Sequence, residues 1–307
     1  MRYVRGGPLS LLADLKSGKR GAVAKAISSV ENGAAGSRAL MKSIFRDPGD
    51  SVIIGITGPA GSGKSSLINR AAIELGRLGA RPAVLAVDPT SHLTGGAILG
   101  DRVRMAESAD SGTYIRSIAS RGATGAVSAH VRDITRVLEY AGFNPVIIES
   151  VGAGQTEVEI SRIADITVVV FNPHTGDGIQ AVKAGITEIG DICVVNKGDL
   201  PGAQKLQEAL KEFVGSDGGP PVLMASAKTG SGVKALARML YKMMEAGARR
   251  EGRLEEELRG VILNNIKERI DSMLDADETY QECLKKVRAR RMDPREAAEK
   301  VARKLVG

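Results

Sequence analysis

The stretch GPAGSGKS at residues 58–65 decides the fold, because the apolar run VIIGIT precedes it and the helical stretch SLINRAAIELGRLG follows it. Its spacing is that of the pattern G-x-x-x-x-G-K-[ST], with Gly58, Gly63, Lys64 and Ser65 in the required places. A glycine-rich turn with a chance Lys-Ser pair is the alternative, and it does not account for a strand before the loop and a helix after it. The sequence therefore predicts a phosphate-binding loop.

The residue types of this loop suit a phosphate ligand. Glycines allow the backbone to adopt a positive φ and bring its N–H groups close to the phosphates, and the following helix adds its positive N-terminal dipole. We expect Lys64 to reach the β- and γ-phosphates and the Ser65 hydroxyl to bind Mg²⁺. The residues expected to contact the nucleotide here are Gly58, Ala60, Gly61, Ser62, Gly63, Lys64, Ser65 and Ser66.

The segment VVNKGDL at residues 194–200 indicates which base is bound. Asn196, Lys197 and Asp199 have the N-K-x-D arrangement at the end of an apolar run. A carboxylate accepts hydrogen bonds from N1–H and the exocyclic amine of guanine, whereas adenine offers neither donor there. An Asn/Asp turn at a strand end is the alternative. After a phosphate-binding loop, this arrangement predicts GTP as the ligand.

A later segment, PVLMASAKTGSG, adds a weaker signal for the same base. Ser226, Ala227 and Lys228 stand at the end of an apolar run, where a backbone N–H group could contact guanine O6. The tripeptide also suits an ordinary turn between a strand and a helix. Under the first interpretation, these three residues line the base site.

The segment NPVIIESVGAGQTE contains candidates for metal binding and hydrolysis. Glu149 ends an apolar run where nucleotide hydrolases with this loop usually have the Asp that holds Mg²⁺. Gly152 and Gly154 free the backbone beside the expected γ-phosphate. Gln155 is a candidate for positioning the attacking water, with a plain loop or switch residue as the alternative.

Two further carboxylates are candidates for Mg²⁺ or its waters. Asp88 closes the run AVLAVD, and Asp101 follows a glycine-bearing loop. Carboxylate oxygens are hard ligands that suit this ion. A strand-end turn is the alternative for Asp88, and a helix cap is the alternative for Asp101.

Six short apolar runs alternate with helical stretches between Ser51 and Gly247: VIIGIT, AVLAVD, VIIES, ITVVVF, ICVVNK and PVLMAS. This alternation is typical of a parallel sheet covered on both faces. We therefore predict an α/β fold, a P-loop nucleotide hydrolase with a mainly parallel central sheet covered by helices. We expect an N-terminal helical extension over 1–48, the hydrolase domain over 49–247 and a C-terminal helical extension over 248–307.

The charge balance does not favour a nucleic-acid partner. The chain has 307 residues, a formal net charge of +7 and a pI near 9.4, and a basic surface can bind nucleic acid. From Arg249 onward, however, 15 Lys and Arg residues are interleaved with 13 Asp and Glu residues, which is typical of solvated helices. We expect no nucleic-acid binding.

The sequence shows no pattern typical of a membrane span, a disulfide framework or a cysteine-based metal site. The opening residues have no continuous apolar stretch, and no window approaches 18 apolar residues, so we expect a cytoplasmic protein without a membrane partner. Cys193 and Cys283 form no C-x-x-C pair, which predicts neither a disulfide framework nor a thiolate zinc site. The three histidines, at positions 92, 130 and 174, are dispersed without metal-ligand spacing.

Several long segments together resemble the MeaB/ArgK family of P-loop GTPases, the chaperones of adenosylcobalamin-dependent methylmalonyl-CoA mutase. The resemblance spans roughly residues 10–245, and DPREAA near the end is similar to the family's C-terminal end. The segments are GPAGSGKSS, AVDPTSHLTGGAILGDRVRM, YIRSIASRGATGAV, VIIESVGAGQTE, GDGIQAVKAGITEIGD and VVNKGDL.

The resemblance implies a homodimeric GTPase that assists loading of the cobalamin cofactor onto the mutase and protects the mutase during turnover. The C-terminal extension would then be the dimerisation element. The implied site residues are Lys64 and Ser65 for phosphate and Mg²⁺, Asp88, Asp101 and Glu149 for the acidic groups around the metal, and Asn196, Lys197 and Asp199 for guanine.

Lys183, inside GDGIQAVKAG, falls in what the family uses as a mobile switch segment, which makes it a catalytic candidate. From the sequence alone it is equally a solvated Lys on a helical face. Three departures from the family touch the loop expected to sense the γ-phosphate. They are Ser150, Ala153 and Thr156, where the family more often has Thr, Val and Ser.

Two other functions remain as alternatives. A nickel-insertion GTPase has a similar core, although His/Cys clusters would be expected near its N-terminus and this sequence has none there. A transport-associated kinase would transfer phosphate to a protein rather than to water.

Overall fold

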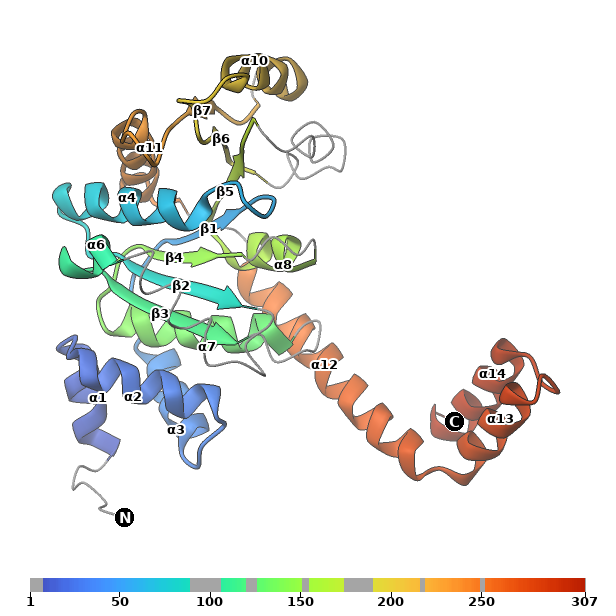
Figure 1. Ribbon diagram of the computed structural model, residues 1–307. Helices are drawn as coiled ribbons and strands as arrows, with labels where there is room; N and C mark the ends of the chain where they lie inside the picture. The colour runs from blue at the N-terminus through green and yellow to red at the C-terminus, as the bar shows by residue number, and fades with distance from the viewer. Residues whose placement is uncertain are drawn as a thin grey trace. The chain divides into compact units, whose positions relative to one another are not determined.

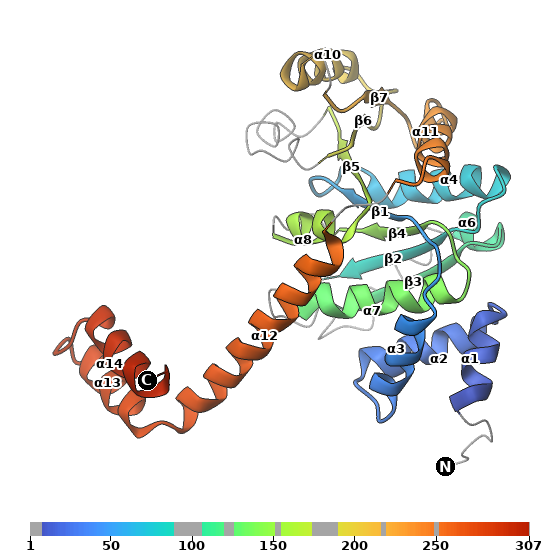
Figure 2. The same cartoon turned by 180° about the vertical axis from the view of Figure 1, so that it is seen from behind.

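The chain forms two compact units, Met1–Arg253 and Leu254–Gly307. The first contains a parallel sheet with helices on both faces, and the second is built from helices (Figures 1 and 2). The computed structural model describes residues 8–88, 106–119, 126–150, 155–173, 190–215, 219–248 and 252–306.

The sheet has seven parallel strands in the order β3-β2-β4-β1-β5-β6-β7. The six predicted apolar runs form all of them except β3, so the predicted fold class is confirmed. The strands are β1 (Ile53–Thr57), β2 (Ala83–Asp88), β3 (Tyr114–Ala119), β4 (Val146–Glu149), β5 (Ile166–Phe171), β6 (Ile192–Val195) and β7 (Val222–Met224).

Helices follow the strands and also precede them at the N-terminus. In the first unit they are α1 (Pro8–Lys16), α2 (Arg20–Glu31), α3 (Ser37–Arg46), α4 (Lys64–Arg77), α6 (Ala106–Asp110), α7 (Ala126–Tyr140), α8 (Gln155–Ile163), α10 (Ala203–Val214) and α11 (Val233–Glu245). In the second unit they are α12 (Arg253–Ala276), α13 (Glu278–Arg288) and α14 (Pro294–Val306).

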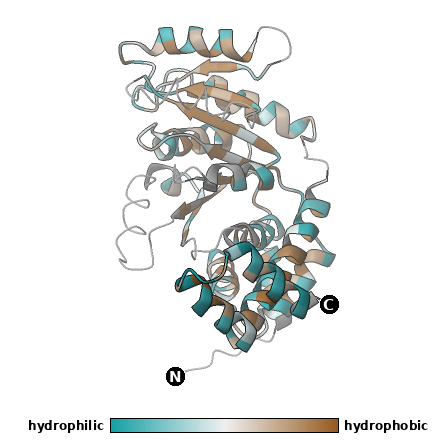
Figure 3. Ribbon diagram, turned by 90° about the vertical axis from the view of Figure 1, so that its right-hand side faces the viewer, coloured by the Kyte–Doolittle hydropathy of each residue, from teal (hydrophilic) through white to brown (hydrophobic). Residues whose placement is uncertain are grey.

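Apolar side chains cover both faces of the sheet, which explains why the strand sequences are nearly continuous in apolar residues. Ile54, Val84 and Val168 face α4 and α11. On the other face, Leu85 packs with α7 and α8, and Cys193 packs with α10. In Figure 3 the strands are accordingly brown, whereas the covering helices carry hydrophilic residues as well.

The three N-terminal helices belong to this core. Val23, Ile27 and Val30 of α2 are buried in the same cluster as strand residues of β2 and β4. Arg116 of β3 donates to the Glu31 carboxylate of α2 at 2.5 Å. The predicted N-terminal extension is therefore packed against the edge of the sheet rather than held by its linker alone.

The second unit encloses a small apolar cluster of its own. Cys283, Ala297 and Val301 are buried there, and Leu274 and Tyr280 pack against them. At the start of α13, Asp277 accepts a hydrogen bond from the Tyr280 N–H group at 2.8 Å and pairs with Lys304 at 2.6 Å. Three helices are thus joined by side chains distant in sequence.

The two cysteines of the chain are both buried, one in each unit. Burial between β5 and β7 raises the pKa of the Cys193 thiol to about 11. Within the described residues, no helix combines the length and apolar character needed to cross a bilayer.

Candidate nucleotide-binding site

The predicted phosphate-binding loop joins β1 to α4 at the carboxyl ends of the parallel strands. Gly58 has φ 138° and Gly63 has φ 85°. A Cβ atom at Gly58 would lie 2.1 Å from the Val170 carbonyl oxygen, and one at Gly63 would lie 2.5 Å from Asn196 Nδ2. Both glycines of the motif are therefore required by backbone conformation and by close approach.

Lys64 begins α4, and its side chain folds back over the loop. It is 7% exposed, and Nζ donates to the carbonyl oxygens of Gly58 at 2.6 Å and Pro59 at 3.1 Å. These contacts hold an ammonium group beside the N-terminus of a helix. The loop therefore concentrates positive charge where an anion would bind.

The Ser65 hydroxyl meets Glu149 beside the loop. Ser65 Oγ donates to Glu149 Oε1 at 2.6 Å, and Glu149 is 6% exposed. The parallel register pairs Glu149 with Ile56 of β1, which explains how a strand distant in sequence brings its carboxylate here. A hydroxyl and a carboxylate are oxygen donors of the type that hard cations such as Mg²⁺ prefer.

Asn196 connects the phosphate-binding loop to the end of β7. Its side-chain amide donates to the carbonyl oxygens of Ser62 at 2.8 Å and Gly63 at 3.2 Å. Its carbonyl oxygen accepts from the Ala227 N–H group at 3.1 Å. Because Asn196 is 1% exposed, these contacts are shielded from water and fix the two segments relative to each other.

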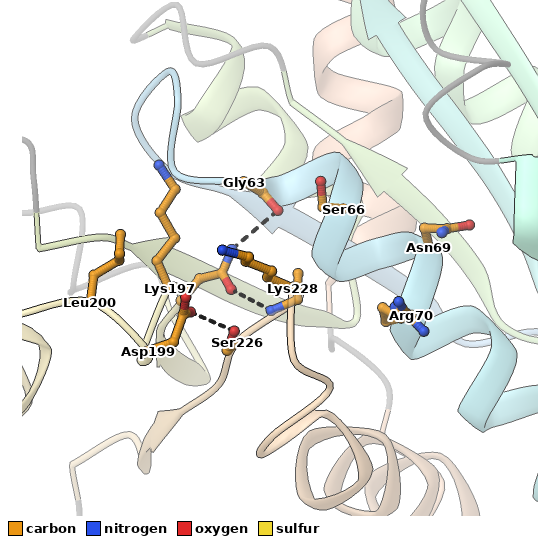
Figure 4. A pocket seen from close by; sticks show the side chains of 11 residues that line it. Gly63, Ser66, Asn69, Arg70, Lys197, Asp199, Leu200, Ser226 and Lys228 are labelled. Carbon is orange, nitrogen blue, oxygen red and sulfur yellow. Dashed lines mark hydrogen bonds between the residues drawn. The ribbon is translucent and has the colours of Figure 1, made fainter.

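Lys197 spans the outside of the same loop. It adopts the left-handed conformation, with φ 57°, and its Nζ donates to the Gly61 carbonyl oxygen at 2.7 Å. The ammonium group is thus engaged at the loop, and the aliphatic stem lies along the wall of the cavity (Figure 4). An apolar stem in that place suits contact with a flat ring.

Ser226 orients the Asp199 carboxylate. Its Oγ donates to Asp199 Oδ1 at 2.6 Å and accepts from the Thr229 N–H group at 3.2 Å. This hydrogen bond is the main cause that holds the pKa of Asp199 below its ordinary value, and the positive charge of Lys228 adds to it. The segment around Ser226 is therefore a turn that also holds the Asp199 carboxylate in place. The sequence did not predict this role for Ser226.

Asn196, Lys197, Asp199 and Ser226 border a cavity of about 520 Å³, whereas Lys64, Ser65 and Glu149 are not among the residues that line it. Figure 4 shows the side chains that border it, with α4 on one side and the loops after β6 and β7 on the other. The lining residues are Gly63, Ser66, Asn69, Arg70, Asn196, Lys197, Asp199, Leu200, Ser226, Ala227 and Lys228.

The structure brings most of the candidate residues together at the carboxyl ends of the strands. It also shows three further residues at the cavity. Asn69, Arg70 and Leu200 line the cavity although no motif included them. Leu200 directly follows the N-K-x-D segment, so its position was a usable signal. Asn69 and Arg70 follow the loop motif by one helical turn, and only the orientation of α4 shows that they face the cavity.

Several candidate positions lie outside what the structure describes. The side chains of Asp88 and Gln155 are not among the described ones, although their backbones belong to β2 and α8. Asp101 and Lys183 lie in segments outside the described residues. The roles predicted for these four residues stay predictions.

Comparison with known proteins identifies similar chains along nearly the full length. The family described as "Methylmalonyl Co-A mutase-associated GTPase MeaB" matches residues 23–305. A protein of Pyrococcus horikoshii named as a GTPase is 38% identical, with 97% of this chain and 98% of that one covered. The mitochondrial methylmalonic aciduria type A homolog of Caenorhabditis elegans is 32% identical, with 97% and 82% covered.

The fold is also found among solved structures. That of a LAO/AO transport system kinase aligns with a TM-score of 0.74 and 23% sequence identity, with 100% of both chains covered. At this identity the likeness shows a shared fold.

Proposed function

This chain belongs to the MeaB family of GTPases, and on that basis we propose that it uses GTP hydrolysis to assist methylmalonyl-CoA mutase. In this role it helps to load adenosylcobalamin onto the mutase and protects the mutase during turnover. The main support is the family match over residues 23–305, because the description of that family names the mutase. Relatives named for methylmalonic aciduria point to the same partner.

The geometry of the cavity supports a specific set of nucleotide contacts. Asp199 accepts hydrogen bonds from N1–H and the exocyclic amine of guanine, and the Lys197 stem packs against the ring. The loop N–H groups and Lys64 bind the β- and γ-phosphates. Water attacks the γ-phosphorus, the bond to the β-phosphate oxygen breaks, and the cationic loop stabilises the charge that develops there.

Ser65 and Glu149 fit a Mg²⁺ site in this proposal. Their oxygens lie 2.6 Å apart beside Lys64, and they have the donor chemistry that the ion prefers. Asp88 and Asp101 are the further candidates. When bound, Mg²⁺ would neutralise charge on the β- and γ-phosphate oxygens.

Hydrolysis coupled to a partner is expected to be slow until the partner is bound. The predicted switch segments at 94–101, 152–155 and 176–185 contain glycines, and segments of this type are ordered by the γ-phosphate in other GTPases. A partner that orders them can raise the rate by up to about 10³- to 10⁵-fold, as activating proteins do. Affinity for the partner must then differ between the GTP and GDP forms, because the coupling is reciprocal.

The experiment is GTP hydrolysis with and without the cognate mutase, on wild type and on Lys183→Ala. We expect the mutase to stimulate wild type, and Lys183→Ala to reduce the stimulated rate more than the intrinsic one. Lys64→Ala serves as the inactive control in both conditions. Equal rates with and without mutase would remove the chaperone role and leave the GTPase activity.

The nickel-insertion alternative is tested by the same preparation. Within the described residues, no group of three or more His, Cys, Asp or Glu side chains could hold a metal ion. Nickel binding by equilibrium dialysis, or nickel-dependent stimulation of hydrolysis, would favour that alternative. Transfer of the γ-phosphate to a protein instead of water would favour the kinase.

We also propose that the second unit joins two copies of the chain. The helix α12 presents a wide apolar face, with side chains spaced by three and four residues that are 39–62% exposed. A monomer that left this face in water would carry an unusually large apolar patch. The exposed apolar residues are Leu254, Leu258, Val261, Ile262, Leu263, Ile266, Ile270 and Met273.

The charges of the second unit favour a second copy as the partner. Residues 254–282 contain nine acidic and three basic side chains, whereas residues 283–307 contain nine basic and three acidic ones. In a twofold-symmetric pair, the acidic segment of each copy can face the basic segment of the other. One chain therefore supplies both halves of a complementary surface.

The test for this pairing is sedimentation equilibrium of the full chain. We expect a dimer for wild type, a monomer for the double variant Ile262→Asp/Ile266→Asp, and a dimer for the control Asn265→Asp on the same helix. Raising NaCl should weaken the wild-type dimer, because exposed charge pairs are screened by salt. A monomeric wild type would contradict the proposal.

A further inference from the structure

Arg70 is a cation at the nucleotide cavity that belongs to none of the recognised motifs. It lies on α4, on the side of the helix that borders the cavity (Figure 4). The cavity is also lined by Ser66 and Asn69 of the same helix. Because spacings of three and four residues return to one face of a helix, Ser66, Asn69 and Arg70 form a continuous strip along the cavity.

A long side chain at position 70 can reach the turn of α4 that follows the phosphate-binding loop. The Cα–Cβ bonds of a helix tilt toward its N-terminus, so a long side chain lies over the turn that precedes it. For Arg70, the preceding turn contains Ser66, which follows the loop Ser65 directly. By this general rule, the guanidinium group of Arg70 can extend over the turn of α4 that contains Ser66.

Asn69 and Lys197 contact other segments of the first unit. Asn69, which is 6% exposed, accepts a hydrogen bond from the Ser108 N–H group at 3.0 Å and so attaches α6 to α4. Lys197 donates to the Gly61 carbonyl oxygen, and Lys228 lies with Asp199 at the base end of the cavity. Among the described residues, the cations that line the cavity are Arg70, Lys197 and Lys228, and Arg70 lies on the helix that begins at the phosphate-binding loop.

We propose that the Arg70 guanidinium binds a non-bridging oxygen of the α-phosphate of the bound guanine nucleotide. The α-phosphate lies between the base and the two outer phosphates, which the loop and Lys64 hold in the proposed function on which this inference rests. Arginine suits that place because its planar group donates two parallel hydrogen bonds to phosphate oxygens and keeps its charge at every physiological pH.

The experiment measures dissociation constants for GDP with wild type, Arg70→Lys and Arg70→Ala. Arg77→Ala is the matched control, because Arg77 ends the same helix and does not line the cavity. We expect Arg70→Ala to weaken GDP binding by about 10-fold, the low end for a charge-assisted hydrogen bond, because Arg70 is exposed to solvent. Arg70→Lys should recover part of the loss, and Arg77→Ala should bind like wild type.

Two nucleotide analogues identify the group that Arg70 contacts. The two diastereomers of GDP with sulfur on the α-phosphate differ in which oxygen is replaced, so their affinity ratio should change in Arg70→Ala and stay constant in Arg77→Ala. Replacing GDP by 2′-deoxy-GDP should leave the effect of Arg70→Ala unchanged. An effect that disappears with 2′-deoxy-GDP would assign Arg70 to the ribose and overturn the proposal.

Three variants separate the role of Arg70 from the existence of the nucleotide site. Unchanged GDP binding in Arg70→Ala, with binding lost in Lys64→Ala and guanine preference lost in Asp199→Asn, would overturn the role of Arg70 and keep the site. If none of the three variants changed binding, the cavity itself would not be the nucleotide site. Thermal unfolding of each variant checks that it is folded. If Arg70→Ala does not fold, Arg70→Lys tests whether Arg70 binds the α-phosphate.

Discussion

The Ser226 hydroxyl group orients the carboxylate of the candidate base site. Ser226 donates to Asp199 and accepts from the Thr229 N–H group, so the carboxylate has one orientation. The sequence predicted that Asp199 reads the base. It could not predict this support, because Ser-Ala-Lys is short and the contact joins residues 27 positions apart.

Replacing Asp199 with Asn should change the preferred base. The Asn amide would face the guanine N1–H donor, whereas xanthine offers a carbonyl oxygen at the neighbouring position. We expect GDP affinity to fall by about 10- to 150-fold for each hydrogen bond lost, and xanthosine diphosphate to bind better than GDP. Titration of both nucleotides checks this, with the exposed Asp271→Asn as the control. Unchanged preference would show that Asp199 does not contact the base.

Recognition of guanine should not weaken between pH 8 and pH 5. The hydrogen bond from Ser226 lowers the pKa of Asp199 in the folded protein. The stability that the ionised carboxylate contributes is therefore complete above the unfolded pKa, about 3.9, and is lost as the pH falls through the lower folded pKa. The ratio of GDP to ADP affinity, in which titration of the phosphates cancels, should be constant over this range. A ratio that fell between pH 7 and pH 5 would contradict the assigned direction.

At the scale of elements, strand prediction worked where the strand sequence is continuously apolar, including β7 at one end of the sheet. The six apolar runs became strands, whereas the edge strand β3 was missed. Its sequence YIRSIA is interrupted by Arg116 and Ser117, and Arg116 pairs with Glu31 of α2. The polar residues make sense once the N-terminal helices are seen beside the edge, and that packing is not visible in the sequence.

The sequence also could not show which side chains of α4 line the cavity. The loop motif predicts that a helix begins at Lys64 but not which of its faces borders the base site. Asn69 and Arg70 were therefore missed, although the structure shows that they line the same cavity as Asn196 and Asp199. The rotation of a helix depends on the residues it buries against the sheet, here Leu67, Ile68 and Ala71.

Removing the Asn196 side chain should uncouple the two halves of the site. Asn196→Ala leaves the buried Ala227 N–H group without its partner and frees the Ser62 and Gly63 carbonyl groups. We expect a loss of about 1–3 kcal/mol for an unsatisfied buried group, together with weaker GDP binding. Urea unfolding and GDP titration measure the two effects, and the exposed Asn265→Ala is the control. If Asn196→Ala were as stable as wild type, the hydrogen bonds of Asn196 would not contribute to the stability of the fold.

At the scale of the whole molecule, the N-terminal helices should unfold together with the sheet. Ile27 of α2 is fully buried in a cluster that includes residues of β2 and α7. Ile27→Ala should therefore cost about 2–5 kcal/mol and lower the midpoint of the same thermal transition that GDP raises. The control is Phe213→Ala on α10, whose side chain is 54% exposed. If Ile27→Ala left the GDP-sensitive transition unmoved, the N-terminal helices would be an independent folding unit.

Because one buried cysteine lies in each unit, thiol labelling can measure local opening of the two units separately. Cys193 lies in the first unit and Cys283 in the second, and both are buried. A thiol reagent can modify each one when the surrounding structure opens, and proteolysis with mass spectrometry separates the two products. GDP should slow modification of Cys193 by stabilising the unit that binds it, whereas pairing of two chains should protect Cys283. Without any engineered label, one labelling time course would then report nucleotide binding and self-association as two separate rates.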